Sequence, residues 1–483
     1  VLVATLAFAG TTALGAQGVT TAAIAGVVTD SSGSPLEGAR VAALHGPSGT
    51  AYAAVSRADG RFTIPGMRVG GPYRVTVALV GYRREVQEQI QLSLGGTADL
   101  RFLLGQASVE LEPIIVTGTS NPVFSSERTG AATTISTAQI DHLPTISRRV
   151  EDLLRLTPQY SPMSFGFSFA GQDNRFNNTT IDGSYFNNSF GLAGQPGDRT
   201  GVAPVSLDAI EQLQVNVAPY DVRQGNFVGA GVNMITKSGT NEFSGSMFYN
   251  TRNDNFVGTS AGPNTFNPGT FKYHDVGVAL GGPIIKNRLF FFGSFENDGQ
   301  TSPGTTFQAN NGTQPVAGSV TRVLASDLDA LSAYLKTNFN YVTGPYQGYD
   351  FKIPSTRFLA RLDYNLSDRN KLSLRYNLLN SSSDILISNS ASLGLGGRRS
   401  NLDALNFANS NYAILENIRS VVGEWNSSIG RRMSNNLIAG YTTSDESRKN
   451  IAPPWFPEVE ILQGGKNYTT FGFEPFTPDN QLR

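Results

Sequence analysis

The chain has 483 residues but no cysteine, only three histidines and a charged fraction of 16%. The absence of thiols excludes a disulfide framework and any cysteine-based metal site. Soluble domains carry about 25% charged residues, so the low charge is typical of a protein with part of its surface out of water. The formal net charge of -1 offers no basic footprint, and we expect no nucleic-acid partner.

Catalytic patterns are also missing. His45, His142 and His274 stand alone in the sequence, without a Ser/His/Asp arrangement or the ligand spacing of a metal site. There is no G-x-x-x-x-G-K-[ST] loop for a nucleotide. We therefore expect no enzymatic activity, no metal and no cofactor, with each histidine either solvated or part of a barrel wall.

Long apolar runs are confined to the first residues. Residues 1–16 combine an apolar segment with Ala13-Leu14-Gly15-Ala16, the pattern of a secretory signal peptide remnant. The chain does not begin with Met, so we expect its natural start to be missing. No later stretch approaches the roughly 18 apolar residues of a transmembrane helix, and a membrane location therefore requires a β-barrel.

Residues 21–105 contain short strand-like runs separated by turn clusters, which predicts a small β-sandwich. The segment resembles the carboxypeptidase-regulatory-like domain in Pro35-Leu36-Glu37-Gly38-Ala39, Asp59-Gly60-Arg61-Phe62 and Gly81-Tyr82. That name implies no peptidase here, because a zinc peptidase needs several ligands and His45 is the only histidine of the segment.

A short β-branched run, residues 111–118, follows the predicted sandwich. Ile114, Ile115 and Val116 lie between Pro113 and Gly118. An isolated apolar strand in a connector is available to pair with an exposed sheet edge of another protein. The alternative is that this run forms the first strand of the following domain.

Residues 125–238 predict a mixed α+β domain. Ser136, Ser147 and Ser206 are each expected to open a short helix, the third with Ile210 and Leu213 on its inward face. A tight hairpin is expected at Asp182-Gly183, since glycine tolerates positive φ. The domain also has a polar segment that lacks the ligand spacing of an EF-hand, so a calcium loop is the weaker interpretation. Its candidate ligand-binding residues are Gln172, Asp173, Asn174, Arg175, Asn177 and Asn178.

Residues 241–483 predict membrane-spanning strands, because the period becomes two. Phe358, Ala360 and Leu362 alternate with Arg357 and Arg361. A soluble sandwich also alternates in this way, but here connections of about 20, 6, 57, 3, 36 and 5 residues alternate long and short, as in outer-membrane barrels. We place the strands near 242–251, 271–281, 288–297, 355–366, 370–379, 416–429 and 435–444, with surface loops around 301–354 and 380–415.

Aromatic residues on these strands are candidates for membrane-interface girdles or for plain strand packing. They are Tyr249, Phe290, Phe292, Tyr364, Tyr376, Trp425 and Tyr441.

Taken in order, these motifs resemble a TonB-dependent outer-membrane receptor of the Oar-like group. The resemblance rests on residues 112–118 at the TonB-box position, Leu143-Pro144 and Leu153-Leu154-Arg155-Leu156-Thr157-Pro158, the polar segment with Ile181-Asp182-Gly183, residues 232–241 and residues 281–292. It implies an all-β-dominated chain: a sandwich, an α+β plug, and the first part of an antiparallel barrel of about 22 strands. Only about seven of these strands are present, so we expect the chain to be a fragment.

The resemblance further implies a bacterial outer-membrane receptor that imports an extracellular ligand of unknown identity. Its partners would be outer-membrane lipid and TonB with its inner-membrane energising complex, which would add to the box as a β-strand. The implied TonB-binding residues are Glu112, Pro113, Ile114, Ile115, Val116 and Thr117. The alternative is a non-transporting surface or adhesion protein of the same architecture.

Overall fold

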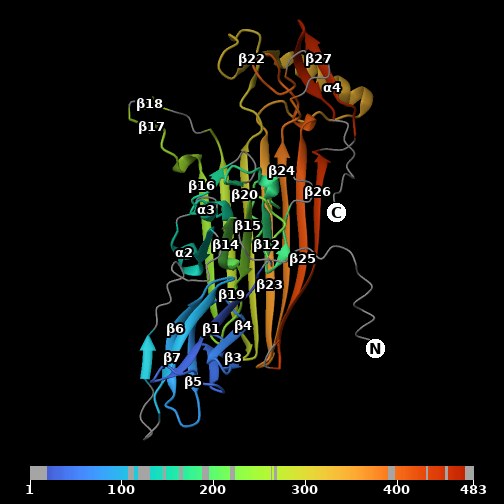
Figure 1. Cartoon of the computed structure of the whole chain (residues 1–483). Helices are drawn as coiled ribbons and strands as arrows, with labels where there is room; N and C mark the ends of the chain where they lie inside the picture. Colours follow the sequence, from blue (N-terminus) through green and yellow to red (C-terminus); the bar gives the residue numbers. More distant parts are fainter. Residues whose placement is uncertain are drawn as a thin grey trace, which may run out of the picture.

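The computed structural model describes residues 19–106, 114–117, 131–143, 145, 148–162, 167–187, 195–217, 224–262, 264–265, 269–389, 397–430, 433–451 and 455–473. The predicted signal remnant at residues 1–16 lies outside these ranges, as do Glu112, Pro113 and Ser147. Figure 1 shows a small domain at one end of a tall sheet, a mixed domain against the sheet, and folded loops at the other end.

The small domain is a sandwich of two sheets, ordered β4-β1-β7 and β3-β2-β5-β6-β8. Alternate residues of β1 and β7 face a common core; in β1 the side chains of Ala22, Ile24 and Val28 are buried. His45 belongs to that core, so the expectation of a solvated or barrel-wall histidine is wrong here: it is 4% exposed and its ring lies 2.7 Å from the Ser48 hydroxyl. The strands are β1 (Ala22–Asp30), β2 (Arg40–His45), β3 (Thr50–Val55), β4 (Arg61–Met67), β5 (Gly70–Ala78), β6 (Glu85–Leu92), β7 (Thr97–Leu104) and β8 (Ile114–Thr117).

The mixed domain, called the plug below, is built on a five-stranded sheet of order β13-β12-β15-β14-β9. Ser136 opens the first helix with a capping box, as predicted. The second helix begins after Arg149, two residues beyond the predicted cap. Its elements are β9 (Ala131–Ser136), α2 (Thr137–His142), α3 (Val150–Leu154), β10 (Tyr160–Pro162), β11 (Phe167–Phe169), η2 (Asn174–Phe176), β12 (Asn178–Ile181), β13 (Ser184–Tyr185), η3 (Leu207–Ala209), β14 (Ile210–Val217) and β15 (Ala230–Thr236).

The third predicted helix is wrong. Ser206 caps only a single 3-10 turn, and the following residues form β14, which pairs with β15 on one side and β9 on the other. Ile210 and Leu213 are buried as expected, but from a strand. The Asp182-Gly183 hairpin is confirmed: both residues have positive φ, 46° and 75°, the conformation of the tightest hairpin turns.

The tall sheet is an antiparallel wall of seven strands that neighbour one another in chain order. Its outward face is apolar: Leu362, Leu374 and Tyr441 are 43%, 50% and 73% exposed, whereas inward-facing Arg357 and Arg375 are 5% and 2% exposed. Exposed apolar side chains and buried charged ones are the arrangement of a barrel in lipid. All but the first are longer than predicted, and the first is shifted by two residues. The strands are β16 (Ser244–Asn253), β19 (Lys272–Ile285), β20 (Leu289–Pro303), β23 (Asp350–Ser367), β24 (Asn370–Ile385), β25 (Tyr412–Ile429) and β26 (Met433–Asn450).

The long connections of the wall, predicted as surface loops, contain helices and strands of their own. Together they form a unit called the loop head below. Its aromatic core includes Tyr341, Phe407, Phe456, Phe471 and Phe473. The loop elements are η4 (Asp254–Phe256), β17 (Ser260–Ala261), β18 (Asn264–Thr265), β21 (Gln308–Asn310), β22 (Val320–Leu324), α4 (Ala325–Phe339), η5 (Ala408–Ser410), β27 (Val459–Gln463) and β28 (Lys466–Phe471). Within the described ranges, no helix is long and apolar enough to cross a membrane.

The predicted fold class is therefore confirmed as a sandwich, an α+β plug and part of an antiparallel barrel. The aromatic candidates fall into two groups. Phe290 and Phe292 are buried inside the wall, as in strand packing, whereas Tyr249 and Trp425 are 66% and 42% exposed, as a girdle residue would be.

Candidate functional site

The TonB-box-like strand is the edge strand of the sandwich. β8 pairs in parallel with β6, with Ile114 opposite Glu85 and Thr117 opposite Glu88. Its β-branched sequence suits extended backbone. It belongs to the preceding domain in this structure, so the alternative of a first strand in the plug is wrong.

The polar segment of the plug separates into exposed and structural residues. Gln172 and Arg175 are exposed, and Arg175 is paired with Asp173 at 2.9 Å. Asn177 is buried, where its amide donates to the Phe167 carbonyl at 2.8 Å and its oxygen accepts from the Ala230 amide. These contacts fix the backbone, so the buried asparagine is a structural residue.

Asn174 and Asn178 are buried too. The Asn178 amide donates to the Gly225 carbonyl at 2.9 Å, and the residue lines a small cavity that Val19 also lines. Because Val19 leads into the sandwich, Asn178 faces the sandwich side of the plug. Of the six candidate ligand contacts, Gln172, Asp173 and Arg175 remain accessible.

The wall holds the plug hairpin through arginines. The Asp182 carboxylate accepts from the amide and hydroxyl of Thr236 at 2.9 and 2.7 Å. Arg361 and Arg375 of the wall each approach Asp182 at 3.4 Å, and Arg361 also donates to the Thr236 carbonyl at 2.8 Å. Asp363 neutralises Arg361 at 2.9 Å. A charged cluster buried at this depth is stable only when it is paired and hydrogen-bonded.

A second cluster lies inside the plug. Arg149 bridges Glu151 at 2.7 Å and Asp198 at 2.9 Å, while Gln195 donates to Glu151 at 2.7 Å. Burial, with the nearby Glu151 charge, raises the pKa of Asp198 to about 8. Burial alone would also raise the pKa of Glu151, but the Arg149 guanidinium outweighs it and the pKa is lowered. One carboxyl of the pair is therefore protonated at neutral pH.

The same segment of the plug contacts the wall. The Gly197 amide donates to the Glu416 carboxylate at 2.6 Å, and Arg199 pairs with Glu446 at 3.3 Å. Glu416 and Glu446 are directly opposite each other on neighbouring strands. Like charges placed so closely require cationic and amide partners, which the plug provides.

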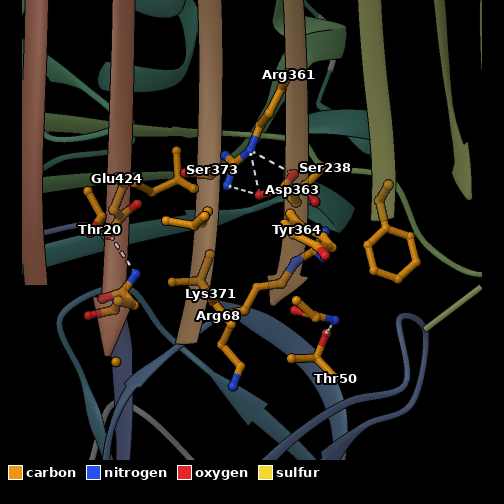
Figure 2. Close-up of a pocket in the computed structure, with 18 of the residues that line it drawn as sticks. Thr20, Thr50, Arg68, Ser238, Arg361, Asp363, Tyr364, Lys371, Ser373 and Glu424 are labelled. Carbon is orange, nitrogen blue, oxygen red and sulfur yellow. Dashed lines mark hydrogen bonds and ion pairs between the residues drawn. The ribbon is translucent and has the colours of Figure 1, made fainter. Parts of the chain in front are cut away.

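A pocket lies where sandwich, plug and wall meet, and Arg68, Glu211 and Lys371 are among the residues that line it. Figure 2 shows Arg361, Asp363, Lys371 and Glu424 on the wall strands above the sandwich. Across it, the sandwich is bonded to its neighbours: the Thr20 hydroxyl donates to Glu424 at 2.5 Å.

Further bonds fix the sandwich. The Leu94 amide donates to the Gln212 side chain of the plug at 2.5 Å, and its carbonyl accepts from Gln214 at 2.7 Å. On the wall side, Asn365 donates to the Thr50 hydroxyl at 3.0 Å. The sequence analysis did not predict these contacts between the sandwich, the plug and the wall. The signal that could have indicated them is the row of side-chain amides on the polar face of β14.

No group of three or more histidine or carboxylate side chains within the described part of the chain has the arrangement of a metal site.

The comparisons with known proteins define the class. Residues 23–105 match the carboxypeptidase regulatory-like domain, and residues 235–481 match the outer membrane beta barrel domain. The second match covers half of the chain, so the chain belongs to the outer membrane beta barrel family and is a protein of the bacterial outer membrane.

One curated relative agrees with the predicted resemblance. The chain is 29% identical over 160 residues to the TonB-dependent transporter Oar of Myxococcus xanthus, a match that covers 31% of this chain and 14% of Oar. Among solved structures, the outer membrane transporter YddB from Escherichia coli matches with a TM-score of 0.48 and 14% identity, covering 71% of this chain and 42% of YddB. The ferric enterobactin receptor PfeA from Pseudomonas aeruginosa matches with a TM-score of 0.43 and 16% identity, covering 74% and 45%. The chain thus spans less than half the length of these relatives.

Proposed function

We propose that the chain is the plug-bearing part of an outer-membrane receptor that imports an extracellular ligand with energy from TonB. The observation that carries the proposal is the plug held against the polar, inward face of a wall whose outward face is apolar. A pore closed by its own domain needs a device that moves that domain. The similarity to a TonB-dependent transporter supports TonB as that device.

In this scheme, TonB adds as a β-strand to residues 112–117. We assign TonB binding to these residues. Main-chain hydrogen bonds give such strand addition its affinity. Tension on the box then reaches the plug through the linker that ends at β9, whose residues pair with β14. Ligand contacts are assigned to Gln172, Asp173 and Arg175, which are the accessible part of the polar segment.

The test is to replace Ile115 by proline in the full-length protein. Proline removes one backbone N–H and restricts φ, so binding of the purified periplasmic domain of TonB to outer-membrane vesicles should weaken about tenfold or more. Ile115→Val keeps the N–H and the β-branched shape and should bind within about twofold of the parent. Equal binding by the proline variant would contradict the box assignment.

A second candidate, a non-transporting surface protein, is favoured by one observation. The loop head has its own core, in which Tyr341 stacks on Phe456 with ring centroids 4.5 Å apart. A folded head is suited to contact with another surface. Adhesion that is unchanged in the Ile115→Pro variant, with no TonB binding by the parent, would favour this function over import.

A further inference from the structure

The strand assigned to TonB is already part of a sheet. In the larger sheet of the sandwich the order is β3-β2-β5-β6-β8, so β8 is the terminal strand. The partnership covers four residue pairs, from Glu85 opposite Ile114 to Glu88 opposite Thr117. It ends where β6 changes conformation, because Gln89 has a positive φ of 61°. The sandwich edge thus accepts a strand of this length.

The outer edge of β8 has no strand beside it within the described residues. In a parallel ladder, the backbone groups of alternate residues point to opposite sides of the strand. Pairing with β6 therefore uses only half of the N–H and C=O groups of β8. The other half form a row along the outer edge, and a β-branched edge of this kind is a template for another strand.

β8 lies on the outer side of the sandwich. In Figure 1, β8 is the cyan arrow at the outer left of the sandwich, on the side away from the tall sheet. The sandwich itself is bonded to the plug and the wall at its opposite end, through Leu94 and Thr50. β8 is consequently held by a domain that is itself bonded to the plug and the wall.

We propose that the sandwich is a platform that presents the box as a preordered strand, and that TonB adds to its outer edge. The sandwich, β8 and TonB then form one continuous sheet. This inference rests on the proposed function and adds a role for the sandwich: β8 is extended before TonB arrives, so association does not have to order its backbone. The competing arrangement is one in which β6 hides the box and TonB must displace it.

A reversible disulfide distinguishes the two arrangements, and the chain has no cysteine of its own. Glu88→Cys with Thr117→Cys places two thiols at paired Cα positions of neighbouring strands, a separation that a disulfide can bridge. The substitution removes one ion pair, between Glu88 and Arg74, whose side chain is 60% exposed. The matched control is Glu88→Cys with Ile114→Cys, which are three residues out of register and should not cross-link.

The measurement is the affinity of the periplasmic domain of TonB for the full-length protein in vesicles, oxidised and then reduced. We expect the in-register disulfide to form and the oxidised protein to bind TonB at least as tightly as the reduced protein. Binding that is lost on oxidation and restored by reduction would overturn the platform in favour of the hidden box. Failure of the in-register pair to cross-link would overturn the pairing itself.

The results that would overturn the proposed function differ from those that would overturn only the platform. If neither the reduced variant nor the parent binds TonB, TonB coupling is wrong and the platform is overturned with it, whatever the cross-linking result. If the reduced variant binds and only the oxidised one does not, import with TonB stands and only the platform is excluded.

Discussion

Asp198 shows how one buried carboxyl makes the plug sensitive to pH. An aspartate in an unfolded chain releases its proton near pH 4, whereas burial beside Glu151 holds the proton on Asp198 up to about pH 8. Between these values the folded plug binds more protons than the unfolded one. The stability contributed by this group is therefore present at low pH and is lost as pH rises through the window, by at most about 1.4 kcal/mol per pH unit.

Asp198→Asn should flatten that dependence, since an amide stays neutral throughout. Hydrogen exchange of the β14 and β15 amides, corrected for intrinsic rates, would report the free energy of plug opening from pH 5 to pH 8. Asp141→Asn is the control, because the Asp141 side chain is 53% exposed and its ion pair with Lys237 is long, at 3.9 Å. A slope in the Asp198→Asn variant as steep as in the parent would mean that another group titrates.

Among the elements, β14 shows where sequence reasoning succeeds and where it stops. The burial of Ile210 and Leu213 was predicted correctly, but a three-residue spacing also occurs in a strand that is covered on both faces. Gln212 and Gln214 are buried because the sandwich lies against them and bonds their side chains. A single sequence does not reveal that a polar face is covered by another domain, so tertiary pairing decided the type of element.

The wall strands were easier to predict, because exposed apolar residues alternate with buried ones along much of their length, as with Leu362 and Leu374 against Arg357 and Arg375. The bounds were less accurate: β25 begins at Tyr412 and β26 ends at Asn450, beyond the predicted apolar alternation. The added end of β26, residues 445–450, is polar, and strand pairing continues into it because backbone groups pair regardless of side chain. The docking of β8 on β6 was not predictable either, since short edge pairing leaves no periodic signal.

The loop head is an element-scale unit whose stability can be tested. Tyr341 is 1% exposed, stacks on Phe456 and accepts a hydrogen bond from the Gly472 amide at 3.0 Å. Tyr341→Ala should destabilise the head by about 3–5 kcal/mol, the usual cost of removing a buried aromatic ring. Tyr334→Ala, at a position 57% exposed, is the matched control.

Limited proteolysis of vesicles provides the measurement for the head. The Tyr341→Ala variant should be cleaved within the loop head while the wall strands remain protected in lipid, and the Tyr334→Ala variant should behave as the parent. Equal resistance of both variants would mean that the head depends on the wall rather than on its own core.

For the whole molecule, the central question is whether the sandwich restrains the plug. Ile235 of β15 is 5% exposed and belongs to the hydrophobic core of the sandwich, and Asn233 donates to the Val19 carbonyl at 2.5 Å. The sandwich is also bonded to the wall through Thr50 and Asn365. Opening of the plug on this side therefore requires either that the sandwich leaves the wall or that plug and sandwich separate.

Bridging Thr50→Cys to Asn365→Cys with a short, reducible thiol reagent would fix the sandwich to the wall. A covalent link of this kind stabilises by about 2–4 kcal/mol, so hydrogen exchange of β14 and β15 should slow about tenfold or more. The Glu88→Cys/Thr117→Cys disulfide is the control, because it joins β8 to the sandwich without linking the sandwich to the wall. Unchanged exchange in the bridged protein would show that the plug opens by separating from a stationary sandwich, in which case tension on the box would have to reach β9 directly through the linker.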